Sequence, residues 1–155
     1  MGISLYTILI GVAGLFAFIQ TIRGKDEFAR VITAFQVIAI GMTFIPDDTA
    51  ISIGFTLYLI SILLIIIYRF VKKGLSKEVR RTILTMTIPI FIIQLFVINQ
   101  WPYAGYLGVG SVIAIISFLY LLKSKYSTFK NQIGFLTVLF IDAVIRSLIT
   151  ISFFT

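Results

Sequence analysis

Residues 51–71 read ISIGFTLYLISILLIIIYRFV, and the run LISILLIIIY at 59–68 holds one serine and one tyrosine among aliphatic side chains. A stretch of about 20 mostly apolar residues is long enough to cross the ~30 Å hydrocarbon core of a bilayer. Arg69 stands near its end, where a long side chain can reach the interface while its stem stays in lipid. The stretch therefore predicts a membrane-spanning helix.

The rest of the chain has the same character. Over 155 residues, 59% are hydrophobic and only 12% are charged, which is about half the charge of a typical soluble domain. The sequence predicts an all-α, polytopic transmembrane bundle that forms a single domain over residues 1–155. Six spans are expected, at about residues 3–22, 28–45, 51–71, 82–98, 103–122 and 133–154. The second is the weakest, because its fully apolar part begins only at Val31 and Pro46 ends it.

The net charge of +7 is distributed unevenly along the chain. Twelve of the thirteen basic residues fall in three alternate gaps between apolar segments, whereas the other two gaps hold none. Lys and Arg in short loops mark the cytoplasmic side of a membrane. This pattern predicts a protein of the cell membrane with both termini on the non-cytoplasmic side. The three groups are Arg23, Lys25 and Arg30; Arg69, Lys72, Lys73, Lys77, Arg80 and Arg81; and Lys123, Lys125 and Lys130.

The same distribution bears on partners and on the short second span. Basic loops at a cytoplasmic surface are expected to contact anionic lipid headgroups. Because topology and lipid contact account for the positive charge, nucleic acid is not expected as a partner. If residues 28–45 lay only at the interface, every later loop would change sides, and the three basic gaps would no longer face one compartment. The charge pattern therefore favours a second segment that crosses.

Residue types needed for most catalysis are missing. The chain has no Cys and no His, so it offers neither thiolate chemistry nor the commonest metal ligand, and it has no Gly-rich phosphate loop. Asp47 and Asp48 follow Pro46, where an aspartate is expected to form a turn and cap the next helix; a bound cation is the alternative reading. We expect no catalytic residue, no metal site and no cofactor.

Asp142 and Arg146 are the only charges inside a long apolar run, IGFLTVLFIDAVIRSLITISFFT at 133–155. A charge at the bilayer centre costs on the order of 3 kcal/mol, so it normally faces the protein interior and finds partners. Their i, i+4 spacing places both on one helix face, within reach of a salt bridge. The pair is expected either to lock the last helix to its neighbours or to serve as a proton, ion or substrate site.

Amide side chains inside other spans are the expected partners of this pair. Gln36 lies in the second predicted span and Gln94 in the outer half of the fourth, and a further glutamine, Gln20, ends the first. Such amides usually bond across a helix interface. By depth, Gln94 is the one expected to meet Arg146.

Small residues four apart mark expected helix contacts, because they let two backbones approach closely in lipid. The chain has three such pairs, and the last lies directly beside Asp142 and Arg146. The pairs are Ala13 with Ala17, Gly110 with Ala114, and Ala143 with Ser147.

Residues 91–122 read FIIQLFVINQWPYAGYLGVGSVIAIISFLYLL, with Gln100-Trp101-Pro102-Tyr103-Ala104 at the turn and Gly105 and Gly108 after it. This segment resembles a helical hairpin of Bacteroidetes membrane proteins, among them the membrane subunit of the gliding and type IX secretion motor, whose turn reads His-Trp-Pro-Gly-Ala. Gln100 stands in place of the His and Tyr103 in place of the Gly. The resemblance implies a turn at the membrane surface around Trp101 and Pro102.

Together these observations predict a non-enzymatic multi-pass protein of the inner membrane. It is expected to act as a subunit or assembly partner of a larger membrane complex, or of a homo-oligomer. The alternative is a small proton, ion or solute carrier or channel that uses Asp142 and Arg146 within the membrane.

Overall fold

A computed structural model of the chain describes residues 5–23, 25–101, 106–124 and 129–151. This part of the chain is all-α, with six α-helices and one short 3-10 helix. The helices are α1 (Leu5–Arg23), α2 (Glu27–Met42), α3 (Asp48–Val71), α4 (Lys77–Ile98), η1 (Tyr106–Gly110), α5 (Ser111–Ser124) and α6 (Ile133–Ile151).

Polar side chains in the connecting turns start three of the helices. Asp26 caps α2, and the predicted cap at Asp47 is confirmed, because its carboxylate accepts a hydrogen bond from the Ala50 N–H at 2.8 Å. Ser76 caps α4 by accepting from the Val79 N–H at 3.2 Å. These bonds satisfy N–H groups that a helix start leaves without partners.

Four described helices are long and apolar enough to cross a membrane: Asp48–Val71, Lys77–Ile98, Tyr106–Lys123 and Ile133–Ile151. A shorter apolar stretch, Ile8–Gln20, lies in α1. By length and composition the chain is therefore a multi-pass membrane protein.

Several helix ends differ from the predicted spans. α2 ends at Met42, three residues before the predicted end at 45, because residues 43–45 form a turn ahead of Pro46. α4 begins at Lys77, five residues before the predicted start at 82, because the Ser76 cap nucleates it within the polar loop. Residues 103–105 of the fifth predicted span lie outside the described residues, 106–110 of it form the 3-10 helix η1, and α-helical geometry starts only at Ser111. Glycines at 108 and 110 disfavour an α-helix there.

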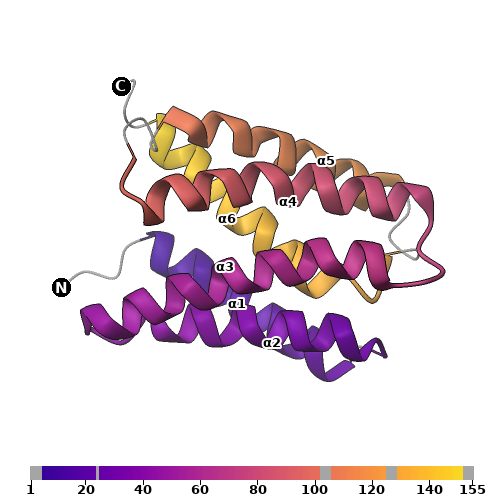
Figure 1. Cartoon of the computed structure of the whole chain (residues 1–155), viewed down its shortest axis with the longest axis horizontal. Coiled ribbons are helices and arrows are strands. Elements are labelled where there is room, and N and C mark those ends of the chain that lie inside the picture. The colour runs from indigo at the N-terminus through magenta and orange to yellow at the C-terminus, as the bar shows by residue number, and fades with distance from the viewer. Residues whose placement is uncertain (1–4, 24, 102–105, 125–128, 152–155) are drawn as a thin grey trace.

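α6 occupies the centre of the bundle. Figure 1 shows it running obliquely between a lower group of α1, α2 and α3 and an upper pair of α4 and α5. It packs against α1, α2, α4, α5 and η1, and half of its membrane-length segment is buried, more than in any other candidate span of the described residues. Its fully buried side chains include Phe135, Leu136 and Leu139.

The turns that carry the basic residues gather at one end of the molecule. In Figure 1 the end of α1 and the start of α2, the end of α3 and the start of α4, and the end of α5 and the start of α6 all lie at the right-hand end, which we call the basic end. Polar contacts between residues of these connections, described below, agree with that placement. The bundle thus has one basic end, and the α2–α3 turn and the end of α4 lie at the opposite end.

Candidate functional site

Asp142 and Arg146 form an ion pair in the middle of α6. The Arg146 Nε lies 2.8 Å from the Asp142 Oδ2, and the two side chains are 14% and 17% exposed, respectively. Their spacing of one helical turn permits this contact without any movement of the backbone. The pair is therefore mostly enclosed by the bundle, as its cost in lipid requires.

Gln94 brings α4 into the same cluster. Its side-chain oxygen accepts a hydrogen bond from the Arg146 Nη2, so the contact expected between these two residues is present. Gln94 is fully buried, and its Nε2 has no partner among the described residues. Arg146 thus joins an acid on its own helix to an amide on a neighbouring helix.

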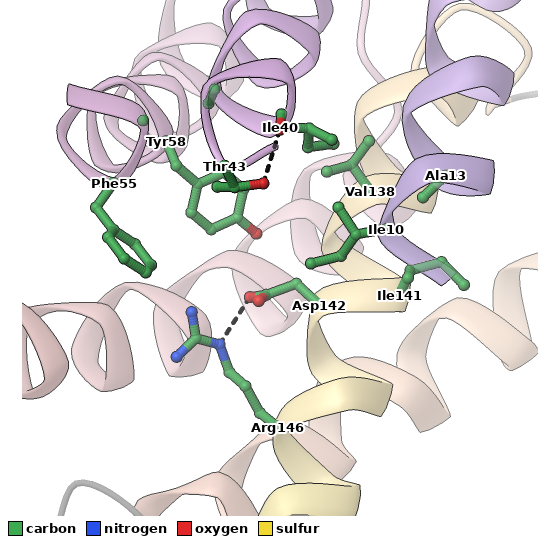
Figure 2. A pocket seen from close by; sticks show the side chains of 12 residues that line it. Ile10, Ala13, Ile40, Thr43, Phe55, Tyr58, Val138, Ile141, Asp142 and Arg146 are labelled. Atoms are coloured by element: carbon green, nitrogen blue, oxygen red, sulfur yellow. Dashed lines mark hydrogen bonds and ion pairs between the residues drawn. The ribbon is translucent and has the colours of Figure 1, made fainter. Parts of the chain in front are cut away.

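Tyr58 of α3 is a polar neighbour that sequence reasoning missed. Figure 2 shows its hydroxyl pointing toward the Asp142 carboxylate. The residue is 9% exposed, and the hydroxyl makes no hydrogen bond with any described residue. A tyrosine in mid-span was the available signal, because a buried phenol normally seeks a partner.

A cavity of about 80 Å³ lies beside these groups, between α1, α2, α3 and α6. Asp142 and Arg146 are its charged lining, and the other lining residues are mainly apolar or small. The Thr43 hydroxyl in its wall is satisfied, since it donates to the Ile40 carbonyl at 2.7 Å. The cavity, which is polar at one corner and apolar elsewhere, has room for a few water molecules. The lining comprises Ile10, Ala13, Ala39, Ile40, Thr43, Gly54, Phe55, Tyr58, Val138, Ile141, Asp142 and Arg146.

Away from the cavity, α6 packs against α5 through small residues. The Ser111 hydroxyl lies 2.8 Å from the Ser147 hydroxyl and donates to the Ala143 carbonyl at 3.1 Å. Ala143 and Ala114 are fully buried, as are Ala17 and, nearly so, Ala13 on α1. Gly110 has only open space where a Cβ would lie, so the close approach falls elsewhere.

Gly108 of η1 makes that close approach. A Cβ there would lie 2.8 Å from the Arg146 carbonyl oxygen and 1.8 Å from the Thr150 hydroxyl. No side chain fits such a space, so η1 and the last turns of α6 require glycine at this position. The site's arginine is thus positioned partly by backbone packing around its own carbonyl.

Gln36 does not join the cluster. Its side chain is fully buried in α2, but neither of its amide atoms has a hydrogen-bond partner among the described residues, and it does not line the cavity. Gln20 lies at the contact between α1 and α6. A Cβ atom added to Gly134 of α6 would lie 3.1 Å from the Gln20 Cβ.

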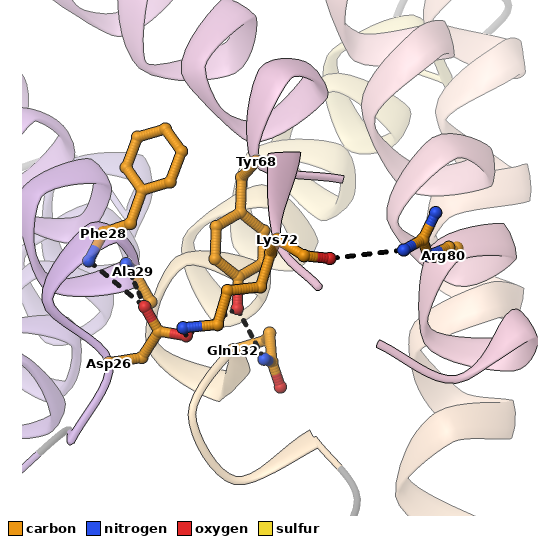
Figure 3. A network of polar contacts seen from close by, with 7 residues as sticks. All are labelled: Asp26, Phe28, Ala29, Tyr68, Lys72, Arg80 and Gln132. Atoms are coloured by element: carbon orange, nitrogen blue, oxygen red, sulfur yellow. Dashed lines mark hydrogen bonds and ion pairs between the residues drawn. The ribbon is translucent and has the colours of Figure 1, made fainter. Parts of the chain in front are cut away.

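A second polar network, absent from the sequence predictions, links the three turns at the basic end (Figure 3). The Asp26 Oδ2 lies 2.7 Å from the Lys72 Nζ and accepts from the Tyr68 hydroxyl at 3.0 Å. Tyr68 in turn accepts from the Gln132 Nε2 at 2.7 Å. Residues before α2, at the end of α3 and before α6 are thereby joined.

This network holds the Asp26 carboxylate in its charged form. Burial raises the pKa of Asp26, but hydrogen bonds from Lys72, the Ala29 N–H and Tyr68 lower it by more. The net result is a pKa below the ordinary value of 3.8. Lys72 is 41% exposed and so keeps contact with solvent, whereas the Asp26 side chain is 4% exposed.

The surface turn after α4 is built by backbone bonds. Gln100 has a φ of 52°, and the Trp101 N–H donates to the Phe96 carbonyl at 3.0 Å while the Gln100 N–H donates to the Val97 carbonyl at 3.1 Å. This is a Schellman motif with its usual apolar contact, because the Trp101 and Phe96 rings lie 4.8 Å apart. Trp101 is 49% exposed, and Pro102 lies outside the described residues.

Comparisons with protein-family models, with curated proteins and with solved structures gave no match.

Proposed function

We propose that this protein is a six-span, non-enzymatic subunit of the cell membrane that assembles with other membrane proteins or with copies of itself. The four long apolar helices are the established part of that topology. The position of the three basic turns at one end of the bundle supports crossings by α1 and α2 as well. In this topology the basic end is cytoplasmic and both termini are not.

The observation that carries the structural role is the set of contacts that Arg146 makes with two helices, α6 and α4. Its guanidinium contacts Asp142 on α6 and Gln94 on α4. The next residue of α6, Ser147, forms a hydrogen bond with Ser111 on α5. Polar groups that satisfy one another across helices hold a membrane bundle together. A cluster of this kind supports a rigid helical subunit whose outer faces meet lipid and partners.

The alternative role is a small proton, ion or solute carrier. The cavity of about 80 Å³ beside Asp142, together with the Tyr58 hydroxyl that points toward Asp142, supports this second candidate. In such a protein Asp142 would take up the transported ion and Arg146 would tune its charge.

The resemblance of residues 91–122 to the Bacteroidetes hairpin remains a proposal about the lineage of the α4–α5 pair. It adds no activity to the proposed function. Proposed partners are anionic lipid headgroups at the basic turns, other membrane subunits or a second copy of the chain.

Replacement of the ion pair separates the two roles. Arg146→Leu alone leaves Asp142 and Gln94 without their donor, and we expect it to lower the unfolding free energy by about 3 kcal/mol. Apolar residues often replace a complete buried pair at little cost, so the triple variant Q94L/D142L/R146L should be within ~1 kcal/mol of wild type. Thermal unfolding in detergent and native mass spectrometry of the oligomer measure both effects.

The result that contradicts the structural role is a triple variant that folds and assembles like wild type yet fails to restore function in a deletion strain. Proton flux in liposomes then tests the alternative, with Asp142→Asn as the variant and Asp48→Asn, in the base-free turn, as its control. Absence of flux through the wild-type protein under an imposed gradient would rule out the proton carrier.

A further inference from the structure

A groove of about 650 Å³ opens on the outside of the bundle near the basic end, between α3, α4 and α5. Four cations line it, Arg69 from α3 and Lys77, Arg80 and Arg81 from the start of α4, and no acidic residue does. The remaining lining is chiefly apolar and comes from α4 and α5: Leu84, Thr85, Ile88, Pro89 and Ile113. One groove therefore joins a cationic mouth to an apolar floor.

Two of the cations are held in place by backbone carbonyls. The Arg69 Nε donates to the Arg80 carbonyl at 3.2 Å, and the Arg80 Nη2 donates to the Lys72 carbonyl at 3.2 Å, the bond drawn in Figure 3. Each of these bonds uses one of the five N–H donors of a guanidinium. No acidic residue lines the groove beside these two arginines. The remaining donors are thus positioned for an anion with several acceptor oxygens.

The dimensions of the groove match a lipid. From Lys77 to Pro89 along α4 is roughly 18 Å, so the mouth lies at headgroup level when the floor lies among acyl chains. Pro89 has no N–H, which leaves the Thr85 carbonyl in the groove wall without its intrahelical donor.

We propose that this groove binds an anionic glycerophospholipid, with the phosphodiester held by Arg69, Arg80, Arg81 and Lys77 and one acyl chain lying on Leu84, Ile88 and Ile113. Arginine forks fit phosphate oxygens in pairs, and the four positive charges select against zwitterionic lipids. The apolar floor gives a lipid the advantage over free phosphate. The inference gives one of the lipid partners proposed above a defined site, and it requires only that α3, α4 and α5 cross a bilayer.

The test uses the full-length protein, delipidated in detergent and titrated with dioleoyl phosphatidylglycerol, with retained lipid counted by native mass spectrometry. One lipid should bind tightly, whereas phosphatidylcholine and inorganic phosphate should bind far more weakly. A Lys or Arg near an anionic surface contributes about fivefold, so Lys77→Gln with Arg81→Gln should weaken binding about 30-fold. The matched control, Lys25→Gln with Lys130→Gln, removes the same charge from the other two basic turns and should leave binding within about twofold.

Equal losses in the two double variants would overturn the proposal, because they would reduce it to a general charge effect. Equal binding of inorganic phosphate or of phosphatidylcholine would overturn it as well. Should the Lys77 and Arg81 variant fail to fold, Ile113→Trp carries the test, since it fills the floor and keeps all four cations. Wild-type affinity in that well-folded variant would also count against the site.

Discussion

At the scale of single residues, the close contact between η1 and α6 depends on the absence of a side chain at Gly108. Gly108 and Gly110 are two residues apart, but only Gly108 lies against another backbone. Ser111, three residues on, bonds to α6 through its hydroxyl. The Arg146 carbonyl lies at this contact between η1 and α6, so the packing there affects the position of the buried ion pair.

Gly108→Ala should therefore lower the unfolding free energy by about 1–3 kcal/mol, because its Cβ would overlap Thr150 and the Arg146 carbonyl and force the two elements apart. Thermal unfolding in detergent measures the loss. Gly110→Ala is the matched control, since its Cβ meets nothing within 4 Å. Equal stability of the two variants would show that η1 does not approach α6 this closely.

At the scale of elements, the bundle is fastened at its centre and at its basic end. The central fastening joins α6 to α4 and α5 through Arg146 and Ser111. The second joins the starts of α2 and α6 to the end of α3 through Asp26, Tyr68 and Gln132. A buried carboxylate that caps a helix, pairs with Lys72 and accepts from a tyrosine makes the second fastening dependent on pH.

The sign of that dependence follows from the lowered pKa of Asp26. Because the folded protein binds this proton less readily than the unfolded chain, the stabilisation is complete above the ordinary pKa of 3.8 and is lost as the pH falls through the folded value. Asp26→Asn should lower the unfolding free energy by about 2 kcal/mol at neutral pH, mainly through the lost ion pair and weaker cap. It should also flatten the pH dependence in the acid range.

Unfolding in detergent between about pH 7 and pH 2 measures both effects. Asp48→Asn, an exposed position in the first turn of α3, is the control and should keep the acid loss of wild type. An Asp26→Asn protein with the full acid loss would place the responsible carboxylate elsewhere.

At the scale of the whole molecule, α1 and α2 are both absent from the four long apolar helices, and the crossing by α2, which has 16 residues, decides on which side every later loop lies. α2 packs against α1, α3 and α6, and Ile32 and Gln36 on it are fully buried. At ~1.5 Å per residue its length is about 24 Å, a little short of the hydrocarbon core. A short span beside longer neighbours is accommodated by local thinning of the bilayer.

Single cysteines test this topology cleanly, because the chain has none of its own. In intact cells a membrane-impermeant maleimide should label Asp48→Cys but not Lys25→Cys or Lys73→Cys, since α2 and α3 each carry the chain across. Labelling after lysis, which should modify all three, is the control. Labelling of Lys25 and Asp48 from the same side would show that α2 does not cross.

Sequence reasoning reached the elements whose signals are local. The apolar runs, the Asp47 cap and the i, i+4 geometry of Asp142 and Arg146 depend on residues close together in the chain. The contact between Gln94 and Arg146 could be predicted too, because few amides lie inside the apolar spans and the depth of each one can be counted along its helix. Gln36 met the same criteria but bonds to nothing described, since depth does not say which way a side chain points.

Length, apolar composition and residue spacing were enough to predict a multi-pass, all-α membrane protein with an ion pair inside its last helix. Apart from Gln94, the neighbours of that pair follow only from how the helices pack against one another. Tyr58 stands out in mid-span as a polar residue, but the sequence does not say which helix its hydroxyl faces, and the cavity has no local sequence signal at all. The small-residue rule chose Gly110 because it assumes α-helical spacing, whereas η1 is a 3-10 helix that presents Gly108. The Asp26 network joins residues 42 and 64 positions apart, which only the packing of the helices brings together.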